Sequence, residues 1–210
     1  MRLILTGCEY AGKSTLAWSL RDWGLGHGFH FHMDDHFTVP DASLRREEEQ
    51  RAALAAPPAM KERFQRFQIY YHLNLLHKYD DIVLVGFHSE EAVYGPRYYY
   101  PGGRLSQDYH RQVEKEAPRD TILAFLSARP EVIRRRMAEA PHRYQMVPEG
   151  DVEAVQAAFE QEFAACWFKH KFRLDTSELA PDKILGVFLS QVKSHLRERD
   201  LLLLQAYAEG

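Results

Sequence analysis

The chain contains 210 residues, a length that suits one domain, with or without a small lid, and leaves no room for two catalytic domains. Hydrophobic residues make up 45% of it and charged residues 27%, the composition of a folded globular protein without long disordered stretches. The net charge of −3 provides no excess of basic residues for gripping a nucleic-acid backbone, so a DNA or RNA polymer is not an expected partner.

The first half of the chain alternates short apolar runs with helical patterns. Residues 2–6 form an apolar run that ends on a glycine, as a buried parallel strand does. A helix is predicted over residues 14–23, where the apolar side chains share one face and glycines follow. Residues 29–33 are a second predicted strand. Residues 41–79 have a helical pattern that a double proline divides into two helices.

The second half continues this alternation. Residues 81–86 are the clearest buried strand, and residues 121–126 form the next one, followed by a proline and a basic helix. An amphipathic helix is predicted over residues 151–168, a short last strand over residues 172–174 and a final helix from Pro181. The alternation predicts an α/β protein with a five-stranded parallel sheet, helices on both faces, and functional residues at the carboxyl edge.

Residues 7–14 have the sequence GCEYAGKS and follow the first strand directly. They fit the phosphate-binding loop pattern of glycine, four residues, glycine, lysine and serine or threonine. Glycines let backbone N–H groups turn inward around phosphate oxygens, and the helix behind adds its dipole. Lys13 is expected to reach the β- and γ-phosphates of ATP, and the Ser14 hydroxyl to bind Mg²⁺. The expected nucleotide contacts are Gly7, Glu9, Tyr10, Ala11, Gly12, Lys13, Ser14 and Thr15.

Two carboxylates, Asp34 and Asp35, follow the second predicted strand and should lie on the rim beside this loop. A carboxylate near a transferred phosphoryl group can take the proton of an acceptor hydroxyl. We expect Asp34 to be this base, with Asp35 as the next candidate. The alternative is that one of them caps the following segment or lies in water. His30 and His32 share a strand face with Asp34, but hydrogen-bonded strand histidines are favoured over a transition-metal site.

The segment after the third strand differs from that of motor-type ATPases, which carry an aspartate directly at the strand end to hold Mg²⁺ and polarise water. Here the strand is followed by Gly-Phe-His-Ser (residues 86–89), and Glu90 and Glu91 come only after that. The segment therefore lacks a carboxylate directly at the strand end that could activate a water molecule. We expect either that Glu90 or Glu91 reaches Mg²⁺ through a water or that the two residues form a solvated acidic pair.

A basic helix follows the fourth strand, where Arg134, Arg135 and Arg136 are consecutive and Arg143 comes after a proline. Arginines on a lid stabilise the charge that spreads over a transferred phosphoryl group, and a closed lid excludes water. We therefore predict a lid over approximately residues 134–150. Because three consecutive arginines point in different directions, at least one of them is expected on a solvated helix face.

The helix over residues 62–73 mixes aromatic side chains with amide and guanidinium groups, a mixture that can hold a flat heterocycle and bind its edge. Phe64, Phe67 and Tyr71 recur at spacings of three and four, so we expect them to pack on the sheet. The tyrosines at 98–100 either line the same cavity or pack a loop. Within an acceptor-binding region of approximately residues 34–105, the expected contacts are Asp34, Asp35, Arg66, Gln68, Glu90, Tyr94 and Arg97.

On these motifs the chain resembles the thymidylate kinase and deoxynucleoside kinase branch of the P-loop kinases, and the order of features matches over most of its length. Residues 66–73, RFQIYYHL, resemble the deoxynucleoside kinase helix whose glutamine reads the nucleobase, a role that would fall on Gln68. Residues 126–131, LSARPE, resemble the strand and Pro-Glu of both families, which makes Arg136 the lid arginine. Asp34 stands where deoxynucleoside kinases have a glutamate base.

The resemblance implies a three-layer P-loop NTPase fold, in one domain over residues 1–210, with a small helical lid. Two departures concern the acceptor. The Glu-Arg-Ser that deoxynucleoside kinases carry after the third strand, and the Asp-Arg of thymidylate kinases, have no clean counterpart in residues 87–91. The position of the family's second lid arginine corresponds approximately to Ala140 in this chain, so Arg143 would have to take the role of that arginine. The Asp-Asp-x-Phe sequence also resembles the aspartate motif of uridine and nicotinamide riboside kinases.

The leading hypothesis is a kinase that transfers the γ-phosphoryl group of Mg·ATP to a hydroxyl of a nucleoside-like small molecule, with Lys13, Asp34, Arg136 and Arg143 as catalytic residues. A nucleoside monophosphate kinase is the nearest alternative, because its acceptor is already anionic and needs cationic clamps more than a base. Two further alternatives remain open, a kinase of a non-nucleoside metabolite and a nucleotide-binding regulator without kinase activity.

Cys8 and Cys166 are the only cysteines, and no signal peptide precedes them, so a reducing cytoplasm is expected and a disulfide framework is not. The most apolar run, residues 201–204, is far shorter than the ~18 to 20 residues of a membrane span. The final helix from Pro181 and residues 200–207 offer apolar surface that either pairs the subunits of a homodimer or covers the sheet.

Overall fold

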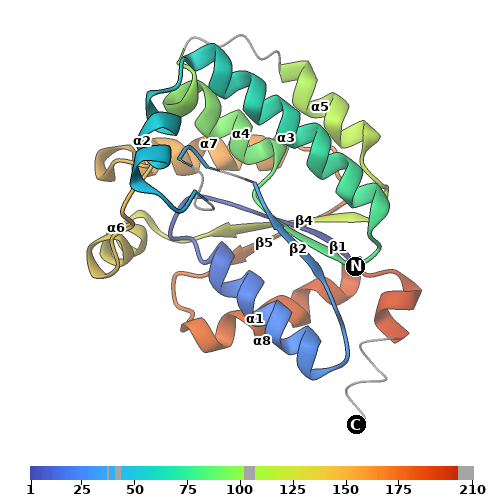
Figure 1. The fold of residues 1–210 in the computed structure, drawn as a ribbon. Coiled ribbons are helices and arrows are strands. Elements are labelled where there is room, and N and C mark those ends of the chain that lie inside the picture. Colours follow the sequence, from blue (N-terminus) through green and yellow to red (C-terminus); the bar gives the residue numbers. More distant parts are fainter. Residues whose placement is uncertain (37, 41–43, 102–106, 203–210) are drawn as a thin grey trace.

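Five parallel strands form the central sheet of the computed structural model, which describes residues 1–36, 38–40, 44–101 and 107–202 (Figure 1). The order across the sheet is β2-β3-β1-β4-β5, and every neighbouring pair is parallel. The predicted number and direction of the strands are confirmed. The strands are β1 (Arg2–Thr6), β2 (His32–Asp35), β3 (Ile82–Val85), β4 (Thr121–Ser127) and β5 (His170–Asp175).

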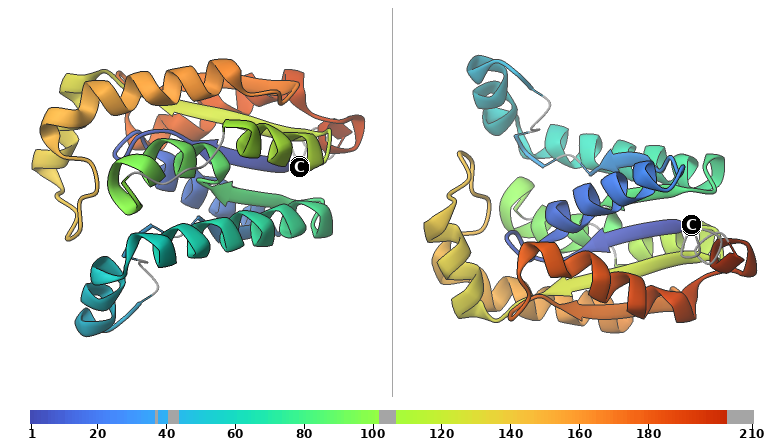
Figure 2. Two further views of the ribbon diagram at one scale, coloured as in Figure 1. Left: turned by 90° about the horizontal axis from the view of Figure 1, so that it is seen from above. Right: turned by 90° about the horizontal axis from the view of Figure 1, so that it is seen from below.

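Helices cover both faces of the sheet, as predicted. Helices α1 and α8 lie on one face, and α3, α4, α5 and α7 lie on the other, while α2 and α6 stand at the carboxyl edge (Figures 1 and 2). The α-helices of the described residues are α1 (Lys13–Gly26), α2 (Glu47–Ala55), α3 (Pro58–Lys78), α4 (His88–Tyr94), α5 (Gln107–Glu116), α6 (Pro130–Glu139), α7 (Val152–Ala165) and α8 (Pro181–Val192). A π-helical turn, Gly95–Tyr99, follows α4 directly.

The three inner strands, β1, β3 and β4, are largely apolar because both of their faces are covered. Leu3 and Leu5 of β1 belong to a buried cluster with Leu16 of α1 and Phe188 of α8. Ile4, which points to the other face, belongs to a second cluster with side chains of α3 and α5. A strand buried on both faces gives the continuous hydrophobic run that the sequence shows at residues 2–6.

The final helix covers the sheet, which is one of the two roles expected for it. Helix α8 begins at Pro181, as predicted, and buries Ile184, Phe188 and Val192. Of the predicted extension at residues 200–207, the part from 203 onward lies outside the described residues. Among the described helices, none is both long enough and apolar enough to cross a membrane.

The second strand begins later than predicted, at His32 rather than at residue 29. Phe29 stacks on Trp23 of α1 with ring centroids 6.3 Å apart, so this segment still belongs to the turn that packs against the helix. The strand consequently runs on to Asp35, and Asp34 and Asp35 lie inside it instead of beyond its end. Because successive side chains of a strand point to opposite faces, these two carboxylates point away from each other.

The aromatic side chains of α3 that we expected to pack on the sheet lie on its exposed face, so that prediction is wrong. Phe64, Phe67 and Tyr71 are 45%, 72% and 43% exposed. Residues on either face of the helix recur at spacings of three and four. Spacing alone therefore does not show which face packs on the sheet. The face that packs on the sheet is buried and mixes aliphatic with polar side chains, namely Gln65, Gln68, Ile69, His72, Leu73, Leu75 and Leu76.

Ile69→Ala should lower the free energy of unfolding by about 2 to 5 kcal/mol, because the residue is fully buried and its truncation leaves a cavity. Phe67→Ala, the matched control on the same helix, should change that free energy by less than about 0.5 kcal/mol. Urea unfolding followed by circular dichroism measures both values. An equal cost for the two variants would contradict the observed orientation of α3.

Candidate active site

The glycine loop, residues 7–14, connects β1 to α1 through backbone angles that favour glycine. Gly7 and Gly12 have φ angles of 144° and 98°. A Cβ on Gly7 would lie 2.2 Å from the carbonyl oxygen of Leu126, so no larger residue fits there. Gly12 is the N-cap of α1, and Lys13 is the first residue of the helix. The loop therefore places the N-terminal end of α1, with its unpaired N–H groups, at the carboxyl edge of the sheet.

The side chain of Lys13 turns back over the loop and is almost fully buried. Its Nζ donates a hydrogen bond of 2.6 Å to the carbonyl oxygen of Gly7 and lies 2.9 Å from Oε1 of Glu90 in α4. Burial disfavours the charge on Lys13, but the carboxylate of Glu90 outweighs this effect and raises the pKa of the lysine. Two buried opposite charges thus join the glycine loop to α4.

Glu90 and Glu91 are both buried, so the expectation of a solvated acidic pair is wrong. The carboxylate of Glu91 accepts a hydrogen bond of 2.5 Å from Nε2 of His110 in α5, while Glu90 pairs with Lys13. Burial raises the pKa of both carboxyl groups. Neither partner is near the glutamates in the chain, which is why local spacing did not reveal these pairs.

A cleft of about 980 Å³ opens beside the glycine loop. Its walls are formed by α2, by residues 135–146 and by residues 177–181. Of the predicted nucleotide contacts, only Gly7 and Ala11 lie outside its lining; both are buried within the loop. The loop, the start of α1, the sheet edge and α4 contribute to the lining Cys8, Glu9, Tyr10, Gly12, Lys13, Ser14, Thr15, Asp35, Val85, Glu90 and Tyr94.

The oxygen atoms that face the cleft are of the kind that Mg²⁺ binds. Ser14 is exposed at the first turn of α1, and Asp35 is exposed at the end of β2. Both residues line the cleft. Magnesium prefers hard oxygen ligands and usually keeps several waters, so one hydroxyl and one carboxylate at an open surface fit it.

Asp35 lines the cleft, whereas Asp34, the residue we expected to be the base, lies outside its lining. Oδ1 of Asp34 lies 3.8 Å from Nε2 of His72 in α3 and accepts a hydrogen bond of 2.9 Å from the Asp35 N–H. Burial tends to raise the pKa of Asp34, but His72 and the hydrogen bonds bring it below its usual value. The reason for this difference is the position of the strand end, because β2 extends through both residues and turns Asp34 towards α3.

The lid is held against the glycine loop by Glu9 and Tyr10. The carboxylate of Glu9 accepts hydrogen bonds of 3.0 and 2.9 Å from the N–H groups of Met146 and Val147. The hydroxyl of Tyr10 accepts one of 2.8 Å from the His142 N–H, and the two rings stack with centroids 4.2 Å apart. Sequence reasoning missed this contact because the partners are more than 130 residues apart.

Arg136 of α6 joins the lid to the floor of the cleft. Its guanidinium donates hydrogen bonds of 2.9 Å to the carbonyl oxygen of Tyr10 and 2.7 Å to that of Thr176. The hydroxyl of Thr176 in turn donates one of 2.9 Å to the carbonyl oxygen of Ala11. Arg136 therefore fixes three segments relative to one another: the lid helix, the glycine loop and the segment after β5.

The other arginines of the lid have different partners. Arg134 pairs with a glutamate of α7, and Arg135 lies 3.8 Å from a glutamate of its own helix. Arg143 lines the cleft, and its guanidinium lies 2.9 Å from the carboxylate of Glu47 in α2. Arg143 thus bridges two walls of the cleft, while Arg135 is exposed, as the sequence predicted for at least one of these arginines, and also lines the cleft.

The remaining predicted acceptor contacts divide into two groups. Tyr94 lines the cleft, and its hydroxyl accepts a hydrogen bond of 3.0 Å from the Glu9 N–H. Gln68 lies on the buried face of α3. Arg66 lies 2.5 Å from a glutamate one turn earlier on the same helix. Arg97 donates a hydrogen bond to a carbonyl oxygen of the preceding turn. Within the described part of the chain, the lining of the cleft does not include these last three residues.

Comparison with known proteins finds no matching family model and no matching curated protein, but solved structures do match. YorR from Bacillus subtilis, solved in complex with phosphorylated GDP, has a TM-score of 0.62 at 17% identity, over 94% of this chain and 100% of that one. Deoxyadenosine kinase from M. mycoides with bound dCTP has a TM-score of 0.60 at 16% identity, over 92% and 100%. Thymidylate kinase from Candida albicans has 0.58 at 13%, over 92% of each.

The chain has the fold of the P-loop nucleoside and nucleotide kinases. The resemblance first seen in residues 7–14, 66–73 and 126–131 is thereby confirmed at the level of the fold. In this kinase fold the glycine loop lies at the carboxyl end of β1, the central strand, with α6 and the segment after it above the cleft.

Arg136→Met should lower the free energy of unfolding by about 1.5 to 3 kcal/mol, because it removes charge-assisted hydrogen bonds to two carbonyl oxygens. It should also weaken nucleotide binding, since the glycine loop loses a support. Arg134→Met on the same helix, whose ion pair with Glu153 lies outside the lining of the cleft, is the control and should change both quantities much less. Thermal unfolding and titration with a fluorescent nucleotide measure the two effects, and equal behaviour of the variants would contradict the role given to Arg136.

Proposed function

We propose that the protein is an ATP-dependent kinase that transfers the γ-phosphoryl group of Mg·ATP to a hydroxyl of a nucleoside-like small molecule. The observation that carries the proposal is that Lys13, Ser14 and Asp35 line one cleft. They offer a cation for the phosphates, a hydroxyl for the metal and a carboxylate for the acceptor. The neighbouring structures include a deoxyadenosine kinase and a thymidylate kinase, which supports a small nucleoside or nucleotide as acceptor.

The donor nucleotide would bind along the glycine loop. The N–H groups at the start of α1 point to the cleft and suit phosphate oxygens. The ammonium group of Lys13 would exchange part of its contact with Glu90 for the β- and γ-phosphates. Ser14 would hold Mg²⁺, which when bound neutralises phosphate charge and aligns the transferred group.

Asp35 would be the base. As an acceptor hydroxyl oxygen forms its bond to the γ-phosphorus and the bond to ADP breaks, the hydroxyl proton would pass to the Asp35 carboxylate. Asp35 is exposed in the cleft, so an acceptor molecule that enters from solvent can reach its carboxylate. Arg143, on the opposite wall, would leave Glu47 to stabilise charge on the transferred group, while Arg136 keeps lid and loop in place.

A hydroxyl acceptor is favoured over a phosphate acceptor by the charges around the cleft. The exposed carboxylate of Asp35 lines it and would repel an anionic acceptor, whereas the charge of Glu90 is paired with Lys13. The guanidinium groups of Arg66 and Arg97, which a nucleoside monophosphate kinase would need as clamps, are bonded to their own helical segments. A nucleoside monophosphate kinase, a kinase of another metabolite and a nucleotide-binding regulator remain the alternatives to be tested.

The cytoplasm is the proposed location. Cys8 and Cys166 are both free and buried, a state that suits a reducing compartment. The partner is proposed to be a small molecule and not a nucleic-acid polymer, because the net charge of the chain is −3.

Asp35→Asn should slow phosphoryl transfer by roughly 10²- to 10⁴-fold, the usual contribution of a general base, and should spare ATP binding. Asp34→Asn, one residue away on the opposite face of β2, should cause a much smaller loss. Lys13→Ala should abolish turnover. ADP release in a coupled assay and ATP titration separate the two steps; a larger loss for Asp34→Asn than for Asp35→Asn would reverse the assignment.

The acceptor class can be found by assaying the purified protein with Mg·ATP against nucleosides, nucleoside monophosphates and small alcohols. Turnover of a nucleoside or another alcohol is expected. Turnover of monophosphates alone would refute the hydroxyl acceptor, and tight nucleotide binding without acceptor-dependent ADP release would favour a regulator.

A further inference from the structure

Helix α3 lies at the outside of the molecule, and its outward face carries a row of exposed apolar side chains (Figure 2). Met60 and Tyr70 are 60% and 48% exposed, and they share this face with the exposed side chains of Phe64, Phe67 and Tyr71. Half of the large hydrophobic side chains that are exposed in the described part of the chain therefore lie on this one helix.

The same face lacks formal charge over four turns of the helix. Between Arg63 and Lys78, the exposed positions of α3 are Phe64, Phe67, Tyr70, Tyr71, Asn74 and His77. A helix surface that faces water normally carries many charged side chains. Enrichment in aromatic residues together with depletion of charged ones is instead typical of the centre of a protein–protein interface.

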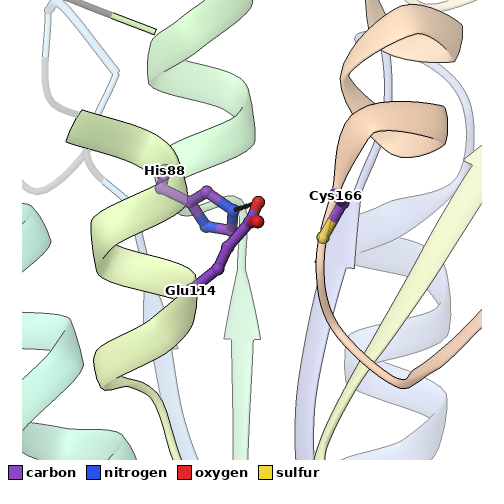
Figure 3. Close-up of side chains that lie close together, drawn as sticks. All are labelled: His88, Glu114 and Cys166. Atoms are coloured by element: carbon purple, nitrogen blue, oxygen red, sulfur yellow. Dashed lines mark hydrogen bonds and ion pairs between the residues drawn. The ribbon is translucent and has the colours of Figure 1, made fainter. Parts of the chain in front are cut away.

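The inner side of α3 is sufficient to hold the helix on the protein. Ile69 and Leu76 belong to a buried cluster with Val113 of α5. Helix α5 is in turn joined to α4 by the buried side chains of His88 and Glu114, which form a hydrogen bond of 2.9 Å (Figure 3). The outward face of α3 is therefore available to a further partner.

The spacing of the row fits a second helix as that partner. Met60, Phe64, Phe67 and Tyr71 follow one another at intervals of four, three and four residues. This is the spacing of the seam along which two helices pack side by side, each side chain entering a hole between those of the other helix.

We propose that a second copy of this chain covers the outward face of α3, so that the α3 helices of two copies pack against each other about a two-fold axis. In such an interface the same patch lies on both sides, and a charged patch would meet its own charge. The row from Phe64 to His77 avoids this repulsion because it has no acidic residue, lysine or arginine at its exposed positions.

The size of the face also fits a dimer. A fully covered aromatic side chain buries roughly 150 to 250 Å², so the exposed parts of the five side chains amount to roughly 500 Å² in each copy. A standard interface buries roughly 800 Å² per partner, of which roughly 450 to 520 Å² is apolar. The outward face of α3 alone thus supplies the apolar share of a standard interface.

The dimer expected from the sequence would then pair through α3 and not through α8, whose apolar side chains cover the sheet. A partner on α3 would also steady α2, the helix that precedes it, and α2 carries Glu47, the partner of Arg143 across the cleft. The pairing does not depend on the reaction proposed for the cleft.

Sedimentation equilibrium of the full-length protein at micromolar concentrations tests the proposal. The expected mass is twice the 24.5 kDa of one chain. The mass of a single chain at every concentration that stays soluble would overturn the proposal. Because association stabilises the folded state, the unfolding of Ile69→Ala and Phe67→Ala is compared below the dissociation constant of the dimer.

Phe67→Glu places a charge on both sides of the interface and should raise the dissociation constant of the dimer at least ~100-fold. Met60→Glu, in the same row, should act in the same direction and provides a second test. Trp18→Glu on α1 is the matched control, since Trp18 is 54% exposed on the other face of the sheet, and should keep the wild-type dissociation constant.

Circular dichroism of the three variants checks that each one keeps its fold. A dimer that Phe67→Glu and Met60→Glu leave as stable as that of the wild type would show that another surface pairs the copies, and would contradict the proposal. Equal weakening by Trp18→Glu would contradict it too, because the effect would not be specific to α3.

Discussion

The ion pair between Lys13 and Glu90 is the contact on which the rest of the cleft depends. Each charge is buried, and each would be costly to bury alone, because an unpaired charge in a protein interior is strongly destabilising. The pair therefore forces the glycine loop and α4 to keep one relative position. The hydrogen bond from the Glu9 N–H to the Tyr94 hydroxyl joins the same two elements a second time.

The lid depends on this arrangement through polar contacts, in addition to the buried apolar side chains of Ile133, Met137 and Val147. Glu9 and Tyr10 hold the segment around residues 142–147, and Arg136 holds Tyr10 and the segment after β5. The same short loop thus presents backbone N–H groups to the cleft and side chains to the lid. A change in the shape of the loop is transmitted to the lid, because the lid has its hydrogen bonds there.

The sequence was informative wherever a feature depends on neighbours in the chain. The strand at residues 2–6, the loop at residues 7–14 and the helix from Pro181 are local patterns, and all are found where predicted. The sequence was less informative where two local patterns were equally good, as for the two faces of α3. It did not reveal contacts between distant residues, such as Glu90 with Lys13, since no spacing rule connects them.

The alternation of Asp34 and Asp35 along β2 ties the chemistry of the cleft to the length of the preceding turn. The register of β2 with β3 determines which face of the sheet each residue faces. A shift of one residue would move each carboxylate to the opposite face. Loss or gain of a single residue between α1 and β2 would therefore present Asp34 or His36 to the cleft instead. The turn is a place where small changes in length, rather than substitutions in the cleft, can alter which side chain of β2 lines the cleft.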